Sequence, residues 1–217
     1  MTRSRLIARP ARETPVDLRT TPGRGRALPE DLLRQASRRV EIVALIGAAL
    51  WTAGPAMGHV ALLAGGDARW AAFVWPLDAI ALTSIAASLA LYFYIRSGSR
   101  PPALVMDLAL VYMVAVALAI AVMIHYTPTA VPTLNGNPMI TWVGPVILMF
   151  AAIVPASPWK MLGAGLVAAS MNPVGMTIAQ RAGVFPADGA PPFLMHYPDY
   201  LLLGVAVVIS HVVTRLG

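Results

Sequence analysis

The sequence predicts an all-α, polytopic integral membrane protein with about six transmembrane helices and both termini in the cytosol. Three observations support this fold class. Of the 217 residues, 58% are apolar and only 12% are charged, whereas a soluble domain has about a quarter charged residues. The mean hydropathy is +0.69, and six apolar segments follow a polar N-terminal part. The basic residues alternate between successive loops, as they do in membrane proteins.

The first 41 residues differ from the rest of the chain. They contain ten of the sixteen basic residues, all of them Arg. Residues 1–28 are also rich in Pro and Thr and too poor in apolar residues to form a core, so we expect a disordered cytosolic tail. Because this charge lies beside a membrane segment, its expected partner is anionic lipid and not nucleic acid.

A juxtamembrane amphipathic helix is predicted over residues 29–41. Pro29 suits the first position of a helix, and Glu30 and Asp31 suit the positive end of the helix dipole. We expect this helix to run along the inner membrane surface and into the first span.

The transmembrane domain is predicted over residues 42–217. A spanning helix needs about 20 residues, and the first three apolar segments are long and almost free of charge. The fourth and sixth are shorter and are included because the loop charges require them. The predicted spans are residues 42–64, 71–95, 103–126, 139–154, 161–179 and 200–213.

The loop charges indicate the orientation. With a cytosolic N-terminus, fourteen basic residues lie on the inner side and only Arg69 and Arg181 on the outer side. This asymmetry follows the positive-inside rule, and five spans would break the alternation. We therefore expect a multi-pass protein of the bacterial cytoplasmic membrane. The chain has no Cys, which excludes disulfides and thiolate chemistry.

The ionisable residues of the outer half are the main candidate site residues. His59, His125 and His196 fall near predicted outer ends of spans. Together with Asp78 and Asp199 they would suit a metal or proton-sensing cluster. The alternative is a set of interface histidines without a ligand, because no pair has the i, i+4 spacing of helical ligands.

Two carboxylates fall within predicted spans, where burial of a charge is costly. Asp78 is expected about 10 Å deep in the second span, at 1.5 Å per residue. It is either functional or a hydrogen-bonded carboxylate beside Pro76. Asp107 is expected in the first turn of the third span, where the helix dipole and the preceding Arg96 and Arg100 favour a carboxylate.

Four prolines are predicted within spans and would kink them: Pro55, Pro76, Pro145 and Pro173. Asn172, directly before Pro173, makes that kink the most polar of the four. The prolines either line an outward-facing pocket or belong to ordinary helix packing. No phosphate-binding loop, kinase motif, zinc-protease motif or nucleophile elbow is present, so no catalytic, cofactor-binding or metal-ligating residue is assigned.

Three segments carry a resemblance to a known family. They are Leu28-Pro29-Glu30-Asp31-Leu32-Leu33-Arg34-Gln35-Ala36-Ser37-Arg38-Arg39, Val154-Pro155-Ala156-Ser157-Pro158-Trp159-Lys160 with Ala169-Ser170-Met171-Asn172-Pro173, and Val208-Ile209-Ser210-His211-Val212-Val213-Thr214-Arg215-Leu216-Gly217. Over residues 28–217 the chain resembles the N-terminal membrane region of bacterial Hanks-type serine/threonine protein kinases. The resemblance implies a membrane-anchoring and stimulus-sensing region, truncated before the catalytic domain.

The kinase domain itself is absent from the sequence, so ATP and Mg are expected only for that missing domain. The expected partners are the lipid bilayer, anionic lipid at the Arg-rich tail, and a second copy of the chain in a homodimer. Two other hypotheses stay open. One is a stand-alone six-helix transporter or channel-like protein that uses Asp78 and the outer histidines, and the other is a purely structural anchor.

Overall fold

The computed structural model describes residues 30–98, 100–126, 140–185 and 191–216. Within these ranges every regular element is a helix, which confirms the predicted all-α class. The elements are α1 (Glu30–Ala64), η1 (Ala68–Ala71), α2 (Leu77–Arg96), α3 (Pro102–Tyr126), α4 (Val143–Ile153), α5 (Pro158–Arg181), α6 (Pro192–Met195) and α7 (Tyr197–Leu216).

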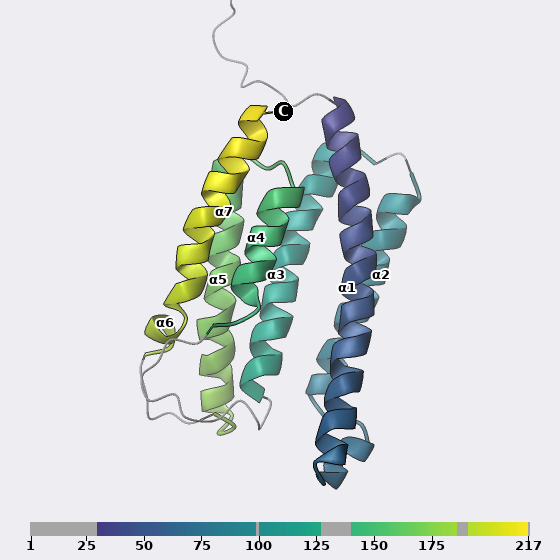
Figure 1. Cartoon of the computed structure of the whole chain (residues 1–217), viewed down its shortest axis with the longest axis vertical. Helices are drawn as coiled ribbons and strands as arrows, with labels where there is room; N and C mark the ends of the chain where they lie inside the picture. Colours follow the sequence, from purple (N-terminus) through teal and green to yellow (C-terminus); the bar gives the residue numbers. More distant parts are fainter. Residues whose placement is uncertain (1–29, 99, 127–139, 186–190, 217) are drawn as a thin grey trace, which may run out of the picture.

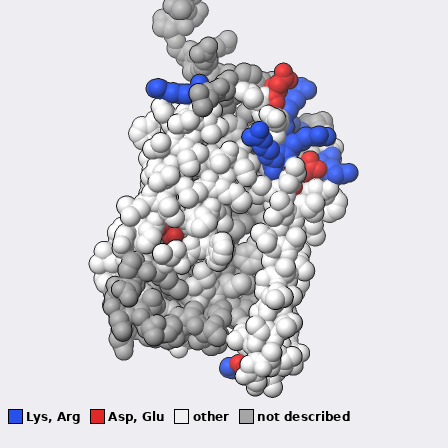
Figure 2. Space-filling view, viewed as in Figure 1, with Lys and Arg blue, Asp and Glu red and all other residues white. Residues whose placement is uncertain are grey.

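The helices form an up-and-down bundle (Figure 1). The start of α1, the α2–α3 turn, the α4–α5 turn and the end of α7 lie together at one end of this bundle, and we call this end the charged end. Figure 2 shows most of the Lys, Arg, Asp and Glu atoms of that face gathered there, above a wide belt that is white except for one small group of acidic atoms.

Five of the described helices are long and apolar enough to cross a membrane: α1, α2, α3, α5 and α7. The helix α4 has 11 residues, fewer than the roughly 20 of a full span. Large apolar side chains cover the outside of the bundle, and Leu50, Met57 and Phe93 are each more than 60% exposed. Exposed apolar surface of this extent is what lipid solvates.

Several predicted boundaries are wrong. The second helix begins at Leu77 instead of residue 71, because residues 68–71 form the separate helix η1, whose N-terminus is capped by the side chain of Asp67. The fourth helix is shorter than the predicted 139–154. The fifth begins earlier than predicted, since Ser157 caps its N-terminus, with Pro158 next to it.

Both ends of the helical region also differ in detail. The predicted juxtamembrane segment is continuous with the first span in the 35-residue helix α1, and α7 extends beyond the predicted 200–213 at both ends. The predicted disordered tail, residues 1–28, lies outside the described residues.

The prediction of four proline kinks is wrong for two positions. Pro55 and Pro173 do lie inside helices. Pro76 instead precedes α2 as its N-cap, and Pro145 lies in the first turn of α4. A proline at either place removes no hydrogen bond of the helix interior and therefore does not bend the helix.

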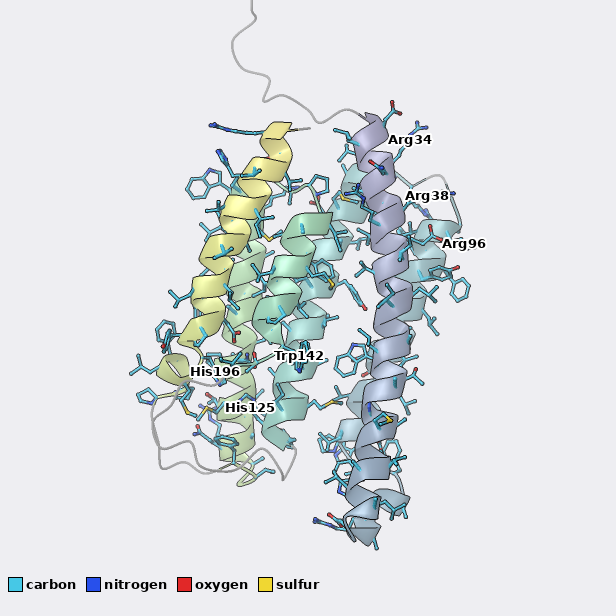
Figure 3. The ribbon with its side chains drawn as sticks, in the orientation of Figure 1. Arg34, Arg38, Arg96, His125, Trp142 and His196 are labelled. Atoms are coloured by element: carbon cyan, nitrogen blue, oxygen red, sulfur yellow. The ribbon has the colours of Figure 1, made fainter. Side chains whose placement is uncertain are left out.

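Small residues allow the closest helix approaches. A Cβ added to Gly175 on α5 would lie 2.9–3.0 Å from the backbone and Cβ of Ala121 on α3, so these two backbones touch. The buried hydroxyls of Ser88 on α2 and Tyr112 on α3 share a 2.7 Å hydrogen bond. The packing of α3 against α5 and α2 positions the part of the bundle away from the charged end, where the buried histidines lie (Figure 3).

Candidate functional site

A carboxylate lies fully inside the helical bundle. Asp199, in the first turn of α7, is 1% exposed. It accepts hydrogen bonds from Asn172 Nδ2 on α5 at 2.6 Å and from the backbone N of Gly144 on α4 at 3.0 Å. The hydroxyl of Thr141 donates to both carboxylate oxygens at 3.3 Å. We call Asp199, Asn172, Thr141 and Gly144 the Asp199 cluster.

Each hydrogen of this cluster has its own acceptor. Asn172 Nδ2 has two hydrogens and donates to Asp199 and, at 2.6 Å, to Thr141 Oγ1. Thr141 Oγ1 also accepts from the backbone N of Val143 at 3.2 Å and uses its single hydrogen for Asp199. Buried polar groups are normally paired in this way. The cluster therefore joins α4, α5 and α7 through one carboxylate.

Glycine leaves room for close contact at the α4 end of the cluster. A Cβ on Gly144 would meet the side chain of Leu202 and lie 3.0 Å from Asp199 Oδ1. The missing side chain thus allows the carboxylate to reach the backbone N–H of the first turn of α4. A carboxylate at a helix N-terminus is favourable, because the unpaired N–H groups and the positive end of the dipole lie there.

Two buried histidines form a second polar feature near the end opposite the charged end (Figure 3). His125 on α3 and His196, directly before α7, are 1% and 0% exposed, and their Nε2 atoms lie 3.3 Å apart. His125 Nδ1 lies 2.6 Å from the carbonyl of Ala121 and must donate to it. If both rings are neutral, His125 Nε2 therefore accepts a hydrogen bond from the N–H of His196 Nε2.

This assignment leaves unpaired atoms. His196 Nδ1 and Asn172 Oδ1 are both buried and have no hydrogen-bond partner among the described residues. Each is an acceptor in the arrangement above, and a buried polar atom without a partner destabilises the fold by about 1–3 kcal/mol. Unpaired buried atoms of this kind are a common mark of a site that takes a proton, a water molecule or a ligand.

His59 and Asp78 form a third polar contact, between α1 and the first turn of α2. His59 Nε2 lies 2.8 Å from Asp78 Oδ1, and His59 Nδ1 lies 2.7 Å from the carbonyl oxygen of Trp70. Both ring nitrogens thus face acceptors, so two hydrogen bonds require either the imidazolium form of His59 or a protonated Asp78. The pair thus links α1 to η1 and to the first turn of α2.

The structure also corrects the expected position of Asp78. It is the second residue of α2 and not seven residues into a span. Its second oxygen accepts from the backbone N of Val74 at 2.6 Å, as a carboxylate in the first turn of a helix does. The prediction that Asp107 lies in the first turn of its helix is wrong, because α3 begins at Pro102. Its carboxylate pairs with Lys160 Nζ at 2.6 Å on the exposed surface.

The candidate residues therefore form two pairs and one cluster. Pro173 adjoins the cluster only as the neighbour of Asn172 in α5. No group of three His, Cys, Asp or Glu close enough to hold a metal ion occurs in residues 30–98, 100–126, 140–185 and 191–216. The metal cluster that the sequence suggested is not formed by these residues.

An exposed ion pair lies at the tip of the α1–α2 connection. Arg69 donates to Asp67 through Nε at 2.9 Å and Nη2 at 2.8 Å. These hydrogen bonds lower the pKa of Asp67 to about 2, because they stabilise its charged form. Asp67 also accepts from the backbone N of Arg69 and so caps η1.

Sequence reasoning missed Thr141 and Gly144 and placed Asp199 only in the expected outer metal or proton-sensing cluster. A signal for Thr141 existed, since a Thr just before an apolar helix is typical of an N-terminal capping residue. No comparable signal pointed to Gly144. Comparison of the chain with known protein families, with characterised proteins and with solved structures found no match.

Proposed function

We propose that this chain is the membrane-anchoring and stimulus-sensing region of a bacterial serine/threonine protein kinase. The supporting observation is the position of the two ends of the helical region. The start of α1 and the end of α7 lie at the same, charged end of the bundle (Figure 1). A catalytic domain joined to α7 would share a compartment with the Arg-rich tail, and in the proposed orientation that compartment is the cytosol, where ATP is available.

The proposal includes six membrane crossings, with α4 as a short fourth crossing. Ten Arg in residues 1–41 and the basic residues of the two inner turns favour a cytosolic charged end. Arg69 and Arg181 then belong to the opposite face. An even number of crossings agrees with the up-and-down order of the helices.

The sensing part of the proposal concerns the buried polar groups of the outer half. The His125–His196 pair and the Asp199 cluster contain the two unpaired acceptors, His196 Nδ1 and Asn172 Oδ1. A proton or a small hydrogen-bond donor that reached these atoms would change contacts among α3, α5 and α7. Because α7 ends at the charged end, such a change would be passed to any domain attached there.

The orientation is tested with reporter fusions in cells. A fusion after Gly217 should report the cytosol, and an insertion near Gly189 should report the periplasm. The reverse pattern would overturn the orientation.

The kinase assignment has its own test. The coding sequence that follows codon 217 should encode, in frame, a glycine-rich loop and an H-R-D motif. A stop codon directly after codon 217 would contradict the assignment while leaving the topology untouched.

The second candidate function is a stand-alone transporter or channel-like protein. A carboxylate fully buried among three membrane helices favours it, because buried ionisable groups often mark ion or proton pathways. Proton or cation flux into vesicles containing the purified chain should then fall strongly with Asp199→Asn, and also with Asp78→Asn if the outer pair takes part. Absence of flux in the unaltered protein would count against this candidate.

A further inference from the structure

A cavity opens at the charged end of the bundle, where the starts of α1 and α3 meet the end of α2. Its volume is about 480 Å³, within the range of small-ligand sites. Figure 3 shows Arg34 and Arg38 of α1 and Arg96 of α2 at this end. The polar side chains that line the cavity are Arg34, Ser37, Arg38, Glu41, Arg96 and Arg100.

Two of these arginines are held in place by the end of α2. Arg96 Nη1 donates to the hydroxyl of Tyr92 at 2.9 Å and lies 3.6 Å from Glu41 Oε1. The guanidinium of Arg100 lies 4.6 Å above the ring of Tyr94. Contact with an aromatic face restrains a guanidinium without neutralising its charge. The cavity lining thus contains four arginines against a single carboxylate, so its net charge is +3.

The surroundings of the cavity distinguish a lipid from a soluble anion. Its lining also contains Ile95, Pro102 and Val105. Exposed apolar side chains occur within two positions of the lining residues on each of the three helices, with Ile42 at 57%, Phe93 at 61% and Leu104 at 42% exposure. The basic cavity therefore passes directly into the apolar outer surface of the bundle. A molecule with a charged head and apolar tails matches both parts.

We propose that this cavity binds the phosphate group of an anionic phospholipid, with the acyl chains lying along the exposed apolar surface of α1, α2 and α3. Arginine suits this role because its planar donors match phosphate oxygens in pairs. Basic pockets between transmembrane helices at the cytosolic surface bind anionic headgroups by the same chemistry. The site is formed by folded helices, so it is distinct from diffuse attraction of the tail, and it does not depend on the proposed kinase function.

Two adjacent arginines of α1 provide a matched test. Arg38 lines the cavity, whereas Arg39 is also exposed but lies outside it. Binding of phosphatidylglycerol and of phosphatidylcholine to the full chain is measured by native mass spectrometry from detergent micelles. We expect binding of phosphatidylglycerol only, weakened about fivefold by Arg38→Gln and less than twofold by Arg39→Gln. Equal losses for the two variants would overturn the site and indicate diffuse charge attraction.

A second variant separates binding from folding. Glu41 is the acidic member of the lining and pairs with Arg96, so Glu41→Gln should strengthen phosphatidylglycerol binding. A gain of affinity cannot come from misfolding. Unchanged or weaker binding by Glu41→Gln would contradict the proposal.

A competition experiment identifies the source of the phosphate. Inorganic phosphate and glycerol phosphate at millimolar concentration should leave phosphatidylglycerol binding unchanged, because neither carries the acyl chains. Displacement of the lipid by either soluble anion would overturn the assignment to a lipid headgroup.

Discussion

Replacement of Asp199 by Ala should destabilise the bundle more than loss of any exposed charge. The substitution removes the acceptor for Gly144 N, Asn172 Nδ2 and Thr141 Oγ1. A side-chain hydrogen bond in a membrane protein contributes about 0.6 kcal/mol on average, and a buried donor left unpaired costs about 1–3 kcal/mol. For three donors the expected loss of stability is about 2 kcal/mol from the hydrogen bonds alone and up to about 9 kcal/mol if all three donors stay buried and unpaired. Asp199→Asn, which keeps an acceptor oxygen, should cost less than Asp199→Ala.

The measurement is reversible unfolding in mixed micelles with increasing sodium dodecyl sulfate, followed by the helical circular dichroism signal. The matched control is Asp107→Ala, since its pair with Lys160 is exposed at both side chains and should contribute less than about 1 kcal/mol. Asn172→Ala should have a smaller effect when combined with Asp199→Ala than alone, because the two side chains share a hydrogen bond. Equal stability of Asp199→Ala and Asp107→Ala would refute the reasoning.

Two further predictions concern packing and the exposed loop. Gly175→Ala should destabilise the protein by about 1–3 kcal/mol relative to Gly163→Ala, because the new methyl meets the backbone of Ala121 while Gly163 has no atom within 4 Å; equal melting temperatures would contradict this. The Asp67 carboxyl should titrate near pH 2 by nuclear magnetic resonance, so its pairing persists above that pH and is lost as the pH falls through it. Arg69→Gln should move the midpoint up towards 3.8, and an unmoved midpoint would exclude the arginine as the cause.

The all-α class could be predicted from the sequence because a chain solvated by lipid has many apolar and few charged residues, here 58% and 12%. Apolar side chains such as Leu50, Met57 and Phe93 lie on the outside of the bundle as well as in its core. Whole segments are therefore apolar, and hydropathy detects them as spans. The boundary at Leu77 was missed for the same reason. Residues 71–76 are almost as apolar as the helix that follows, so hydropathy does not separate the connecting segment from the helix. The local signals of a helix start were Pro76 and Asp78.

The sequence predicted which residues of the candidate site are ionisable, but not which of them contact one another. The sequence singled out His59, His125, His196 and Asp78 because ionisable side chains are rare in apolar segments. Which of them meet depends on helix register and on partners far along the chain. His125 and His196 are 71 residues apart, and Thr141 and Asp199 are 58 apart, so no spacing rule connects them.

The Asp199 cluster also provides a hydrogen-bond acceptor for the start of the short helix α4. Its 11 residues rise about 16 Å, at 1.5 Å per residue, and its first turn lies well inside the bundle, away from both ends of α3 and α5 (Figure 1). In a soluble protein, water would hydrate the free N–H groups of such a helix start. Inside a membrane, lipid would offer no hydrogen bonds, and the buried carboxylate of Asp199 accepts from the backbone N of Gly144 in place of solvent. A buried carboxylate, costly in itself, thereby allows a helix to begin inside the bundle.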